Sequence, residues 1–433
     1  MGEGPIPSGH VQVLWRYAIG RVPGGSWAGV GWTGQPILVD WPAETREHMK
    51  FNREKGPRME VIVGGLDGQI HFIEAGSGRA SRPPIKMPYD YPIKGTITLD
   101  PRGYPVVYTG AGYPVGQPAY RAYDLTNRKE LFNLPGKDPK APKTWPLSDG
   151  NALILNDTLF HAAENGLLYR VALNSRWDAQ TGRLSMQPKV EKVSLGPAGV
   201  ESSIAVWDST GFVSDNHGGV WKFDMEAATL KPTKFFDLGD DADATLVLDP
   251  DGNLYGAREV DRTAGKANPT GAVIKFDQQG RKLWAYTFKA ASIPAGNGRA
   301  YPLNGGVLST GALDWDNGLI FYTTAHDPTG GRGRLIALDV KTGELKWERR
   351  LRGFAWSSPI AVGGRVFAAD SAGAGHVVDA RTGKSLLTDK DGNPTETINL
   401  GANAEGSPIV WKGTIFIGVR GGAMLALGNP TVR

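Results

Sequence analysis

A short phrase recurs about every fifty residues along this chain, and the repeat constrains the fold more than any single residue does. Each copy reads as an apolar strand, a turn and a second strand, followed by Asp, a turn, Gly, an apolar residue and Trp. The clearest copy is LIALDVKTGELKWERRL, which runs from Leu335 to Leu351. A unit of short strands that cannot bury its own faces must stack on its neighbours, so the period predicts the blades of a β-propeller.

The composition agrees with one large array of strands. With 40% hydrophobic and 21% charged residues, the chain has enough apolar material for a core and is not expected to be disordered. Its 59 Gly and 30 Pro residues are typical of many tight turns. We therefore expect one all-β domain over residues 11–428, with flexible ends at 1–10 and 429–433.

Charge and hydropathy exclude several classes of protein. The net charge is +4 and the Lys and Arg residues are scattered, so we expect no nucleic-acid partner. No apolar run is long enough for a transmembrane segment, and the first ten residues, MGEGPIPSGH, do not read as a signal peptide. The chain has no cysteine, which excludes disulfides and thiolate metal sites.

Turn signals divide the chain into blades of four antiparallel strands. The last segment, from Gly406 to Gly428, supplies only three strands, whereas residues 11–20 read as an isolated fourth strand with Trp15 in the place of the repeat Trp. Pairing the two ends completes a last blade and leaves no exposed sheet edge. We therefore predict an eight-bladed β-propeller that closes by pairing its N-terminal strand with the C-terminal blade. The other seven blades are expected at 32–87, 92–134, 145–195, 200–238, 242–288, 303–351 and 355–400.

The aromatic residue that ends each repeat is expected to pack between blades. Its fixed place in the repeat favours a core position over a row of sugar-stacking rings. The segments LDPDGN (248–253) and DKDGNP (389–394) resemble calcium loops but lack the acidic residue at the twelfth position, so we interpret both as hairpin turns.

The phrases ALDVKTGELKW (337–347), SPIAVGGRVFAAD (358–370) and SPIVWKGTIFIG (407–418) resemble the repeat of the PQQ-like, or quinoprotein-type, β-propellers. The resemblance covers nearly the whole chain and is strongest from the fifth blade onward. It implies an eight-bladed fold and a location outside the cytoplasm, at the cell surface, in the periplasm or secreted. It also implies one of two functions: a quinone-dependent dehydrogenase, or a cofactor-free propeller like BamB or the sensor domains of bacterial kinases. The repeat alone does not separate these functions, because function depends on the loops.

The innermost strand of each blade points its first residues at the mouth of the central channel. The eight strands align on the pattern X-small-small-apolar, in the segments TGQP, KGTI, DGNA, ESSI, DATL, NGGV, WSSP and EGSP. The X positions, which form the predicted ring, are Thr33, Lys94, Asp149, Glu201, Asp243, Asn304, Trp356 and Glu405. This oxygen-rich, net negative ring suits a hard cation such as Ca²⁺, a cationic ligand, or a sugar stacked on Trp356. The alternative is a wet channel mouth that is polar without binding any ligand.

The resemblance nominates particular members of the ring. In quinoprotein dehydrogenases a Glu, an Asn and an Asp at comparable positions hold calcium and supply the base. The matching residues here are Glu201, Asn304 and Asp243, with Asp243 as the catalytic residue.

Two functional hypotheses follow. We favour a non-catalytic propeller outside the cytoplasm that binds a partner protein, a polysaccharide or another polymer, or a small ligand at the channel face, with no cofactor beyond Ca²⁺. The missing cysteines support it, because the dehydrogenases commonly carry adjacent cysteines beside the quinone. The alternative is a PQQ- and calcium-dependent dehydrogenase, or a lyase or hydrolase, with its active site at the acidic mouth.

Overall fold

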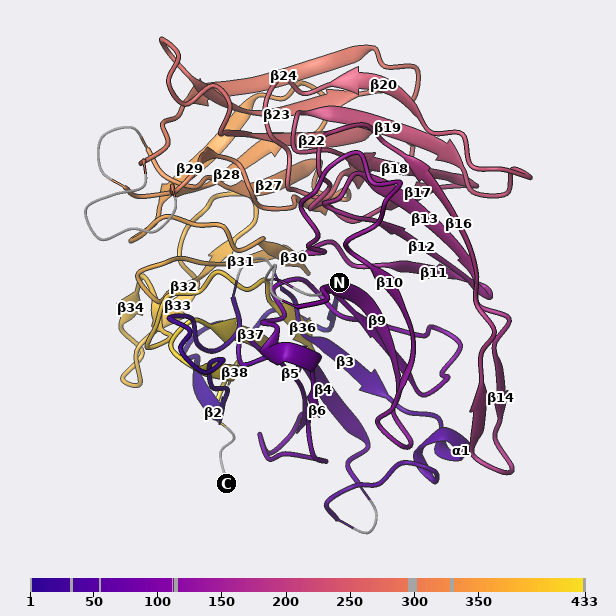
Figure 1. Cartoon of the computed structure of the whole chain (residues 1–433). Helices are drawn as coiled ribbons and strands as arrows, with labels where there is room; N and C mark the ends of the chain where they lie inside the picture. Colours follow the sequence, from indigo (N-terminus) through magenta and orange to yellow (C-terminus); the bar gives the residue numbers. More distant parts are fainter. Residues whose placement is uncertain are drawn as a thin grey trace.

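The computed structural model describes residues 2–430 except 32–33, 54–55, 111, 113–115, 295–301 and 328–330. In these residues the strands form eight four-stranded antiparallel blades arranged in a ring, which confirms the predicted fold (Figure 1). Helical structure in the same residues is confined to α1 (Ala43–Arg46) and a 3-10 turn, η1 (Pro88–Asp90). None of the described helices is long and apolar enough to cross a membrane.

Blades one to seven are meanders whose strands pair in chain order from the strand beside the axis to the outermost strand, and in blade eight the outermost strand is β2, from the start of the chain. Blades one to four comprise β3 (Ile37–Asp40), β4 (Met59–Gly64), β5 (Gln69–Glu74) and β6 (Ile85–Lys86); β7 (Thr98–Leu99), β8 (Val106–Thr109), β9 (Ala119–Asp124) and β10 (Glu130–Pro135); β11 (Leu153–Leu155), β12 (Thr158–Ala162), β13 (Leu167–Ala172) and β16 (Lys189–Ser194); and β17 (Ala205–Trp207), β18 (Thr210–Ser214), β19 (Gly219–Asp224) and β20 (Thr233–Asp237).

The second half of the ring follows the same plan. Blades five to eight comprise β21 (Val247–Leu248), β22 (Leu254–Val260), β23 (Thr270–Phe276) and β24 (Lys282–Lys289); β26 (Ala312–Asp314), β27 (Leu319–Thr323), β28 (Arg334–Asp339) and β29 (Leu345–Arg350); β30 (Ile360–Val362), β31 (Arg365–Ala369), β32 (Ala374–Asp379) and β35 (Ile398–Asn399); and β36 (Ile409–Trp411), β37 (Thr414–Val419), β38 (Ala423–Gly428) and β2 (Gln12–Ala18). The remaining strands are β1 (Gly2–Glu3), β14 (Arg176–Asp178), β15 (Arg183–Ser185), β25 (Gly305–Gly306), β33 (Leu387–Thr388) and β34 (Pro394–Thr395).

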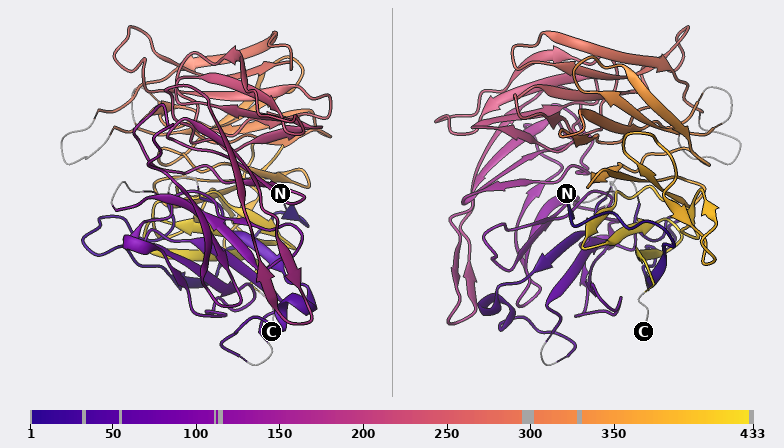
Figure 2. Two further views of the ribbon diagram at one scale, coloured as in Figure 1. Left: turned by 45° about the vertical axis from the view of Figure 1, so that its right-hand side comes forward. Right: turned by 180° about the vertical axis from the view of Figure 1, so that it is seen from behind.

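The ring closes as predicted. Strand β2 pairs antiparallel with β38, and Trp15 lies opposite Ala426. The start of the chain continues inward, because β1 pairs in parallel with β36, the innermost strand of blade eight. Figures 1 and 2 accordingly place the N-terminus near the middle of the ring.

The residues just after β1 are packed, although we expected residues 1–10 to be a flexible end. Ile6 is fully buried and belongs to the apolar core between blades seven and eight. Arg365 donates a hydrogen bond from Nη1 to the carbonyl oxygen of Ile6 at 2.6 Å, and Gly9 forms a parallel bridge with Leu387. An apolar side chain and paired backbone groups therefore hold this segment against the ring.

Blade one has a long insertion between β3 and β4, whose described residues 43–53 lie on the outside of the ring (Figure 1). It contains α1, and His48 donates from Nε2 to the carbonyl oxygen of Ala179 at 2.7 Å. Ala179 lies in the turn between β14 and β15, and Figure 1 shows this hairpin beside α1. The insertion of blade one thus contacts the hairpin of blade three.

The repeat Trp makes the same contact in three places, and the contact crosses to the next blade. In each case the indole N–H donates to a backbone carbonyl oxygen: Trp15 to Ala75 at 2.9 Å, Trp284 to Val340 at 3.2 Å and Trp347 to Ala380 at 2.9 Å. Each indole also lies against a glycine with positive φ in the facing turn, namely Gly78, Gly343 and Gly383. The Trp and Gly of the repeat are therefore two halves of one inter-blade contact, as the expected packing between blades requires.

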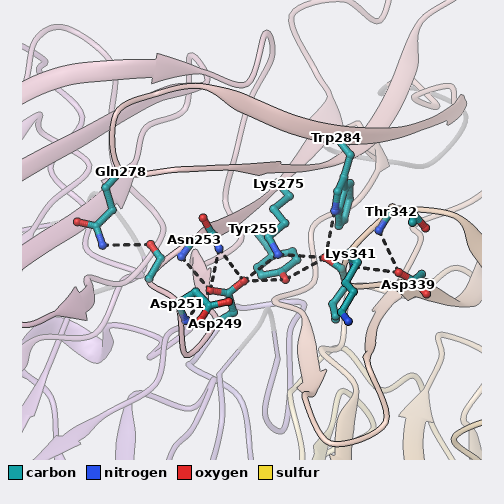
Figure 3. Close-up of polar contacts among 12 residues, drawn as sticks. Asp249, Asp251, Asn253, Tyr255, Lys275, Gln278, Trp284, Asp339, Lys341 and Thr342 are labelled. Carbon is teal, nitrogen blue, oxygen red and sulfur yellow. Dashed lines mark hydrogen bonds and ion pairs between the residues drawn. The ribbon is translucent and has the colours of Figure 1, made fainter.

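Buried polar groups reinforce this contact between blades five and six (Figure 3). Lys275 forms an ion pair with Asp249 at 2.8 Å and donates to the carbonyl oxygen of Val340 at 3.0 Å, which also accepts from Trp284. The hydroxyl of Tyr255 donates to Asp249 at 3.1 Å. The segment LDPDGN is thus a hairpin turn anchored by Asp249, as expected.

Replacing Gly343 by alanine should destabilise the protein more than replacing Gly318. Both glycines have positive φ, +75° and +67°, so both substitutions carry the backbone strain of an L-residue, on the order of 1 kcal/mol. A Cβ at position 343 would lie 2.6 Å from the ring of Trp284, whereas one at 318 meets nothing within 4 Å. We expect G343A to lose about 1–3 kcal/mol more than G318A in chemical denaturation. Equal losses would show that the Trp–Gly contact is not tight.

Candidate functional site

A belt of side-chain hydroxyls fixes how the eight innermost strands align. In successive blades a backbone N–H donates to the hydroxyl at the equivalent position of the next blade. The bonds, each of 3.0–3.2 Å, run from Gln35 to Thr96, Asn151 to Ser203, Ser203 to Thr245, Thr245 to Thr310, Thr310 to Ser358 and Ser358 to Ser407. These positions are the third residue of the predicted pattern in every blade except the sixth.

The predicted register of blade six is therefore wrong by four residues. Thr310 occupies the belt position, so Leu308, not Asn304, is the ring residue of this blade. Leu308 lies four residues before the start of β26 at Ala312. Glu201 lies the same distance before the start of β17 at Ala205. Asn304 instead precedes β25, an added strand that pairs with β22 of blade five.

A cavity of about 590 Å³ opens at the channel mouth. The members of the predicted ring that line it are Lys94, Glu201, Asp243, Asn304 and Trp356. Thr33 lies outside the described residues. The other lining residues include Trp145, Lys143, Asn216, Asp241, Arg262 and Leu308.

Two predicted ring acids are neutralised by the protein itself. Asp149 forms an ion pair with the ammonium of Lys94. Glu405 is bound by Arg420 at 2.5 Å and by the amide of Asn403 at 2.7 Å. Both carboxylates are buried, and neither is among the residues that line the cavity.

The indole of Trp356 does not offer a free face for a sugar. It is only 3% exposed and packs in a small apolar cluster with Leu308 and Phe354. The indole that is open to solvent is Trp145, which is 44% exposed. Its Nε1 donates to Glu164 at 2.8 Å, so the plane of the ring is held at the cavity wall.

The first acidic group of the site consists of Asp149, Glu164 and Glu201, and Lys94 is its counter-charge. Burial alone would lower the pKa of Lys94, but Asp149, Glu164 and Glu201 together raise it above the ordinary value. Burial raises the pKa of each of these three carboxyls, and Lys94 opposes that shift. Lys94 therefore stays charged and compensates this group in part.

A second acidic group, the acid triad, consists of Asp241, Asp243 and Glu259. One carboxylate oxygen from each lies within 4.8 Å of the other two. Glu259 is fully buried and Asp241 is 7% exposed. Burial raises the pKa of all three well above the ordinary values, and repulsion by neighbouring acids adds to it, with Asp243 the main one for Asp241 and Glu259 and Glu201 the main one for Asp243. In the described part of the chain no Lys or Arg forms an ion pair with the triad.

Asn304 completes the triad from blade six. Its amide nitrogen donates to Glu259 Oε2 at 3.1 Å. The remaining oxygens, Asp243 Oδ1, Glu259 Oε1 and Asn304 Oδ1, are buried and accept no hydrogen bond from the described residues. Several unpaired acceptor oxygens around one point form a set that a hard cation satisfies, and the alternative is a proton shared between two of the acids.

Sequence reasoning missed Asp241, Glu259 and Glu164. The alignment considered only the innermost strands, but the ends of the second strands also reach the mouth. Glu259 lies in β22, and Glu164 follows β12. The usable signal was an acidic residue in or just beyond a strand that is otherwise buried.

Comparison with known proteins agrees with this architecture. Residues 269–429 match the family described as outer membrane protein assembly factor BamB. BamB from Moraxella catarrhalis aligns over 92% of this chain and 97% of its own, with a TM-score of 0.53 and 14% identity. Quinohemoprotein alcohol dehydrogenase from Comamonas testosteroni aligns over 98% of this chain and 77% of its own, with a TM-score of 0.60 and 13% identity. Quinohemoprotein alcohol dehydrogenase ADHIIG from Pseudomonas putida HK5 aligns over 100% of this chain and 79% of its own, with a TM-score of 0.61 and 13% identity. No curated protein matches the sequence.

The fold and the family match together define an eight-bladed β-propeller of repeated four-stranded units. The family match covers residues 269–429, the part of the chain where the repeat most resembles that of the PQQ-like propellers. At these identities the solved structures establish the fold alone, and they include both a BamB and alcohol dehydrogenases.

Proposed function

We propose that the protein is a non-catalytic, extracytoplasmic binding propeller whose channel mouth holds a divalent cation such as Ca²⁺ and binds a ligand or partner beside it. The acid triad supports this proposal most strongly. Two buried acids and one half-buried acid that lie this close together carry a large electrostatic cost unless a cation or protons compensate them. The first acidic group has Lys94 for this purpose, whereas no Lys or Arg of the described residues forms an ion pair with the triad, and Lys94 has only the smallest influence on the pKa of Asp243.

The donor set suits calcium. Ca²⁺ takes about six to eight oxygen ligands at about 2.3–2.6 Å, from carboxylates, amide carbonyls and water. Oxygens on opposite sides of the ion are then about 5 Å apart, and the triad oxygens lie within 4.8 Å of one another. The triad and Asn304 supply part of this shell, which leaves positions for water or for oxygens of a ligand in the cavity.

A weak calcium site fits a location outside the cytoplasm. Extracellular calcium modules typically have dissociation constants on the order of 0.1–1 mM, matched to millimolar external calcium. The family resemblance supports the same location. Fractionation of cells that express the full-length protein would test it, and recovery in the cytoplasmic fraction alone would contradict it.

Replacing Asp243 by asparagine should weaken calcium binding at least about tenfold, because the change removes a charged ligand from the triad. Isothermal titration of wild-type protein should give one Ca²⁺ site with a dissociation constant on the order of 0.1–1 mM. Asp316→Asn, which removes an exposed carboxylate elsewhere, serves as the control and should bind like wild type. The proposal fails if wild-type protein takes up no calcium at millimolar concentrations, or if D243N binds it unchanged.

One observation favours the dehydrogenase alternative. Glu201, Asn304 and Asp243, the residues that the resemblance nominates, all line one cavity. The oxygen set fits the calcium of such a site, and PQQ, when bound, would supply a quinone that accepts two electrons from an alcohol. Asp243, whose pKa burial raises, would then hold the proton of the substrate hydroxyl. Titration with PQQ and Ca²⁺ tests this candidate: a quinone absorption band and turnover lost in D243A would support it.

A further inference from the structure

Several buried oxygens in and behind the wall of the cavity accept no hydrogen bond within the part of the chain that the structure describes. Asn216 donates its amide to Glu201 at 2.8 Å, and Asn304 donates to Glu259 at 3.1 Å, so the amide oxygen of each is directed away from that bond. The buried oxygens that accept no hydrogen bond from the described residues are Glu164 Oε1, Asn216 Oδ1, Asp243 Oδ1, Glu259 Oε1 and Asn304 Oδ1. Because buried polar atoms need partners, a ligand that fits this wall must bring hydrogen-bond donors.

Charge argues against an anionic ligand. Glu201, Asp241, Asp243 and Asp261 line the cavity, and Glu164 and Glu259 lie behind it, so these acids outnumber the three basic residues of the lining, Lys94, Lys143 and Arg262. One bound Ca²⁺ would offset only part of this charge. A ligand carboxylate or phosphate would add acceptors to a wall that already has an excess of them.

Trp145 adds a flat apolar surface beside these acceptors. The bond from its Nε1 to Glu164 fixes the ring while 44% of the residue stays exposed. A sugar ring matches this combination, because it has an apolar face of C–H groups and an edge of hydroxyl donors. The aromatic surface and the acceptor oxygens would contact these two parts of the same ring.

The chain itself occupies the opposite end of the ring. Strand β1 adds to the inner edge of β36, and the following residues cross to blade seven, where Ile6 is buried. The start of the chain therefore stands in the way of a polymer that would thread through the channel. A ligand that enters from the mouth reaches the acid triad with one of its ends.

We propose that the cavity binds the terminal ring of a neutral glycan, with its apolar face on Trp145, its hydroxyl oxygens in the open positions of the cation and its hydroxyl protons donated to the carboxylate and amide oxygens that the cation leaves free. This inference rests on the proposed function, since it names the ligand class of the same cation-holding cavity. The excess of acidic groups around the cavity favours neutral sugars over acidic ones.

A glycan array probed with the labelled full-length protein in 5 mM CaCl₂ tests the proposal. We expect retention of neutral glycans, and glycans that carry uronate or sulfate in place of the terminal neutral ring should be retained less. Retention of no neutral glycan, or of acidic glycans only, would overturn the inference. A retained neutral glycan is then titrated in solution.

Two tryptophan variants locate the binding surface. Trp145→Ala should lower the affinity for the retained glycan at least about tenfold, by loss of the stacking surface. Trp315→Ala, which removes an indole that is 36% exposed on the turn between β26 and β27, should leave the affinity unchanged. Equal effects of the two variants would contradict binding at Trp145.

Calcium titration of the same samples separates this inference from the one it rests on. Calcium affinity should be unchanged in Trp145→Ala, because Trp145 is not a ligand of the triad; this also shows that the variant is folded. Calcium binding without glycan binding overturns the glycan inference alone. Glycan binding that persists in EDTA and in D243N supports the ligand class and contradicts the cation.

Discussion

Replacing Lys94 by methionine should lower the free energy of unfolding at pH 7 by about 3–5 kcal/mol, the usual cost of leaving a buried charge without its partner. The ammonium of Lys94 forms an ion pair with Asp149 and also acts on Glu164 and Glu201. Methionine keeps most of the side-chain volume, so the loss reports charge rather than packing. Chemical denaturation of the two proteins measures it.

The variant should recover as pH falls. Burial already raises the pKa of Asp149, Glu164 and Glu201, and loss of Lys94 raises these values further. An acid whose pKa is higher in the folded state stabilises the fold below its unfolded pKa, and this contribution is lost as pH rises through the folded pKa. Stability of K94M should therefore increase between about pH 8 and pH 5, and millimolar Ca²⁺ should also restore part of it.

Lys275→Met provides the matched control. Lys275 also forms a buried ion pair, with Asp249, but the pKa of Asp249 is lowered, and that carboxylate accepts hydrogen bonds from Asn253 and Tyr255. K275M should lose stability without a comparable rescue by calcium. If calcium rescues both variants or neither, Lys94 does not serve as an internal counterpart of the cation.

Calcium binding by the wild-type protein should depend steeply on pH. The pKa values of the triad acids are raised, so calcium must displace protons from them at a higher pH than from ordinary carboxyls. For each proton that calcium binding releases, the apparent affinity for calcium should fall about tenfold when the pH is lowered by one unit. Without divalent cations, protein stability should decrease as pH rises through these pKa values.

Titration calorimetry in two buffers of different ionisation enthalpy counts the protons. We expect about one or two protons per Ca²⁺ at pH 6–7. D243N should bind less calcium and release fewer protons. An affinity that is constant from pH 5 to pH 8 would mean that the triad is already ionised and compensated by another group.

The repeat predicted the architecture because each of its signals has a local physical cause. Trp347 and Gly383 recur at fixed places since one packs on the other across every blade boundary of this kind. Ring closure followed from Trp15, which stands in the strand that the last blade lacks. Buried Ile6 was harder to predict, because a single apolar residue near a terminus carries no periodicity.

The channel mouth was predicted less well than the blades. In blade six the segment from Asn304 imitates the small-residue pattern of the innermost strand, and only the hydrogen bond between Thr245 and Thr310 shows the true register. Glu259 lies on a second strand, in a register that an alignment of innermost strands does not examine. Its backbone N–H donates to the carbonyl oxygen of Asp241 at 3.0 Å, a contact between distant segments that a linear pattern does not contain.

Anomalous scattering from crystals grown with CaCl₂, or soaked with Tb³⁺ as a calcium substitute, would show directly whether the acid triad holds a cation. We expect one strong peak among Asp241, Asp243 and Glu259, at about 2.3–2.6 Å from an oxygen of each. A mouth in which these three carboxyls contact one another with no peak between them, or a peak elsewhere in the channel, would contradict this expectation.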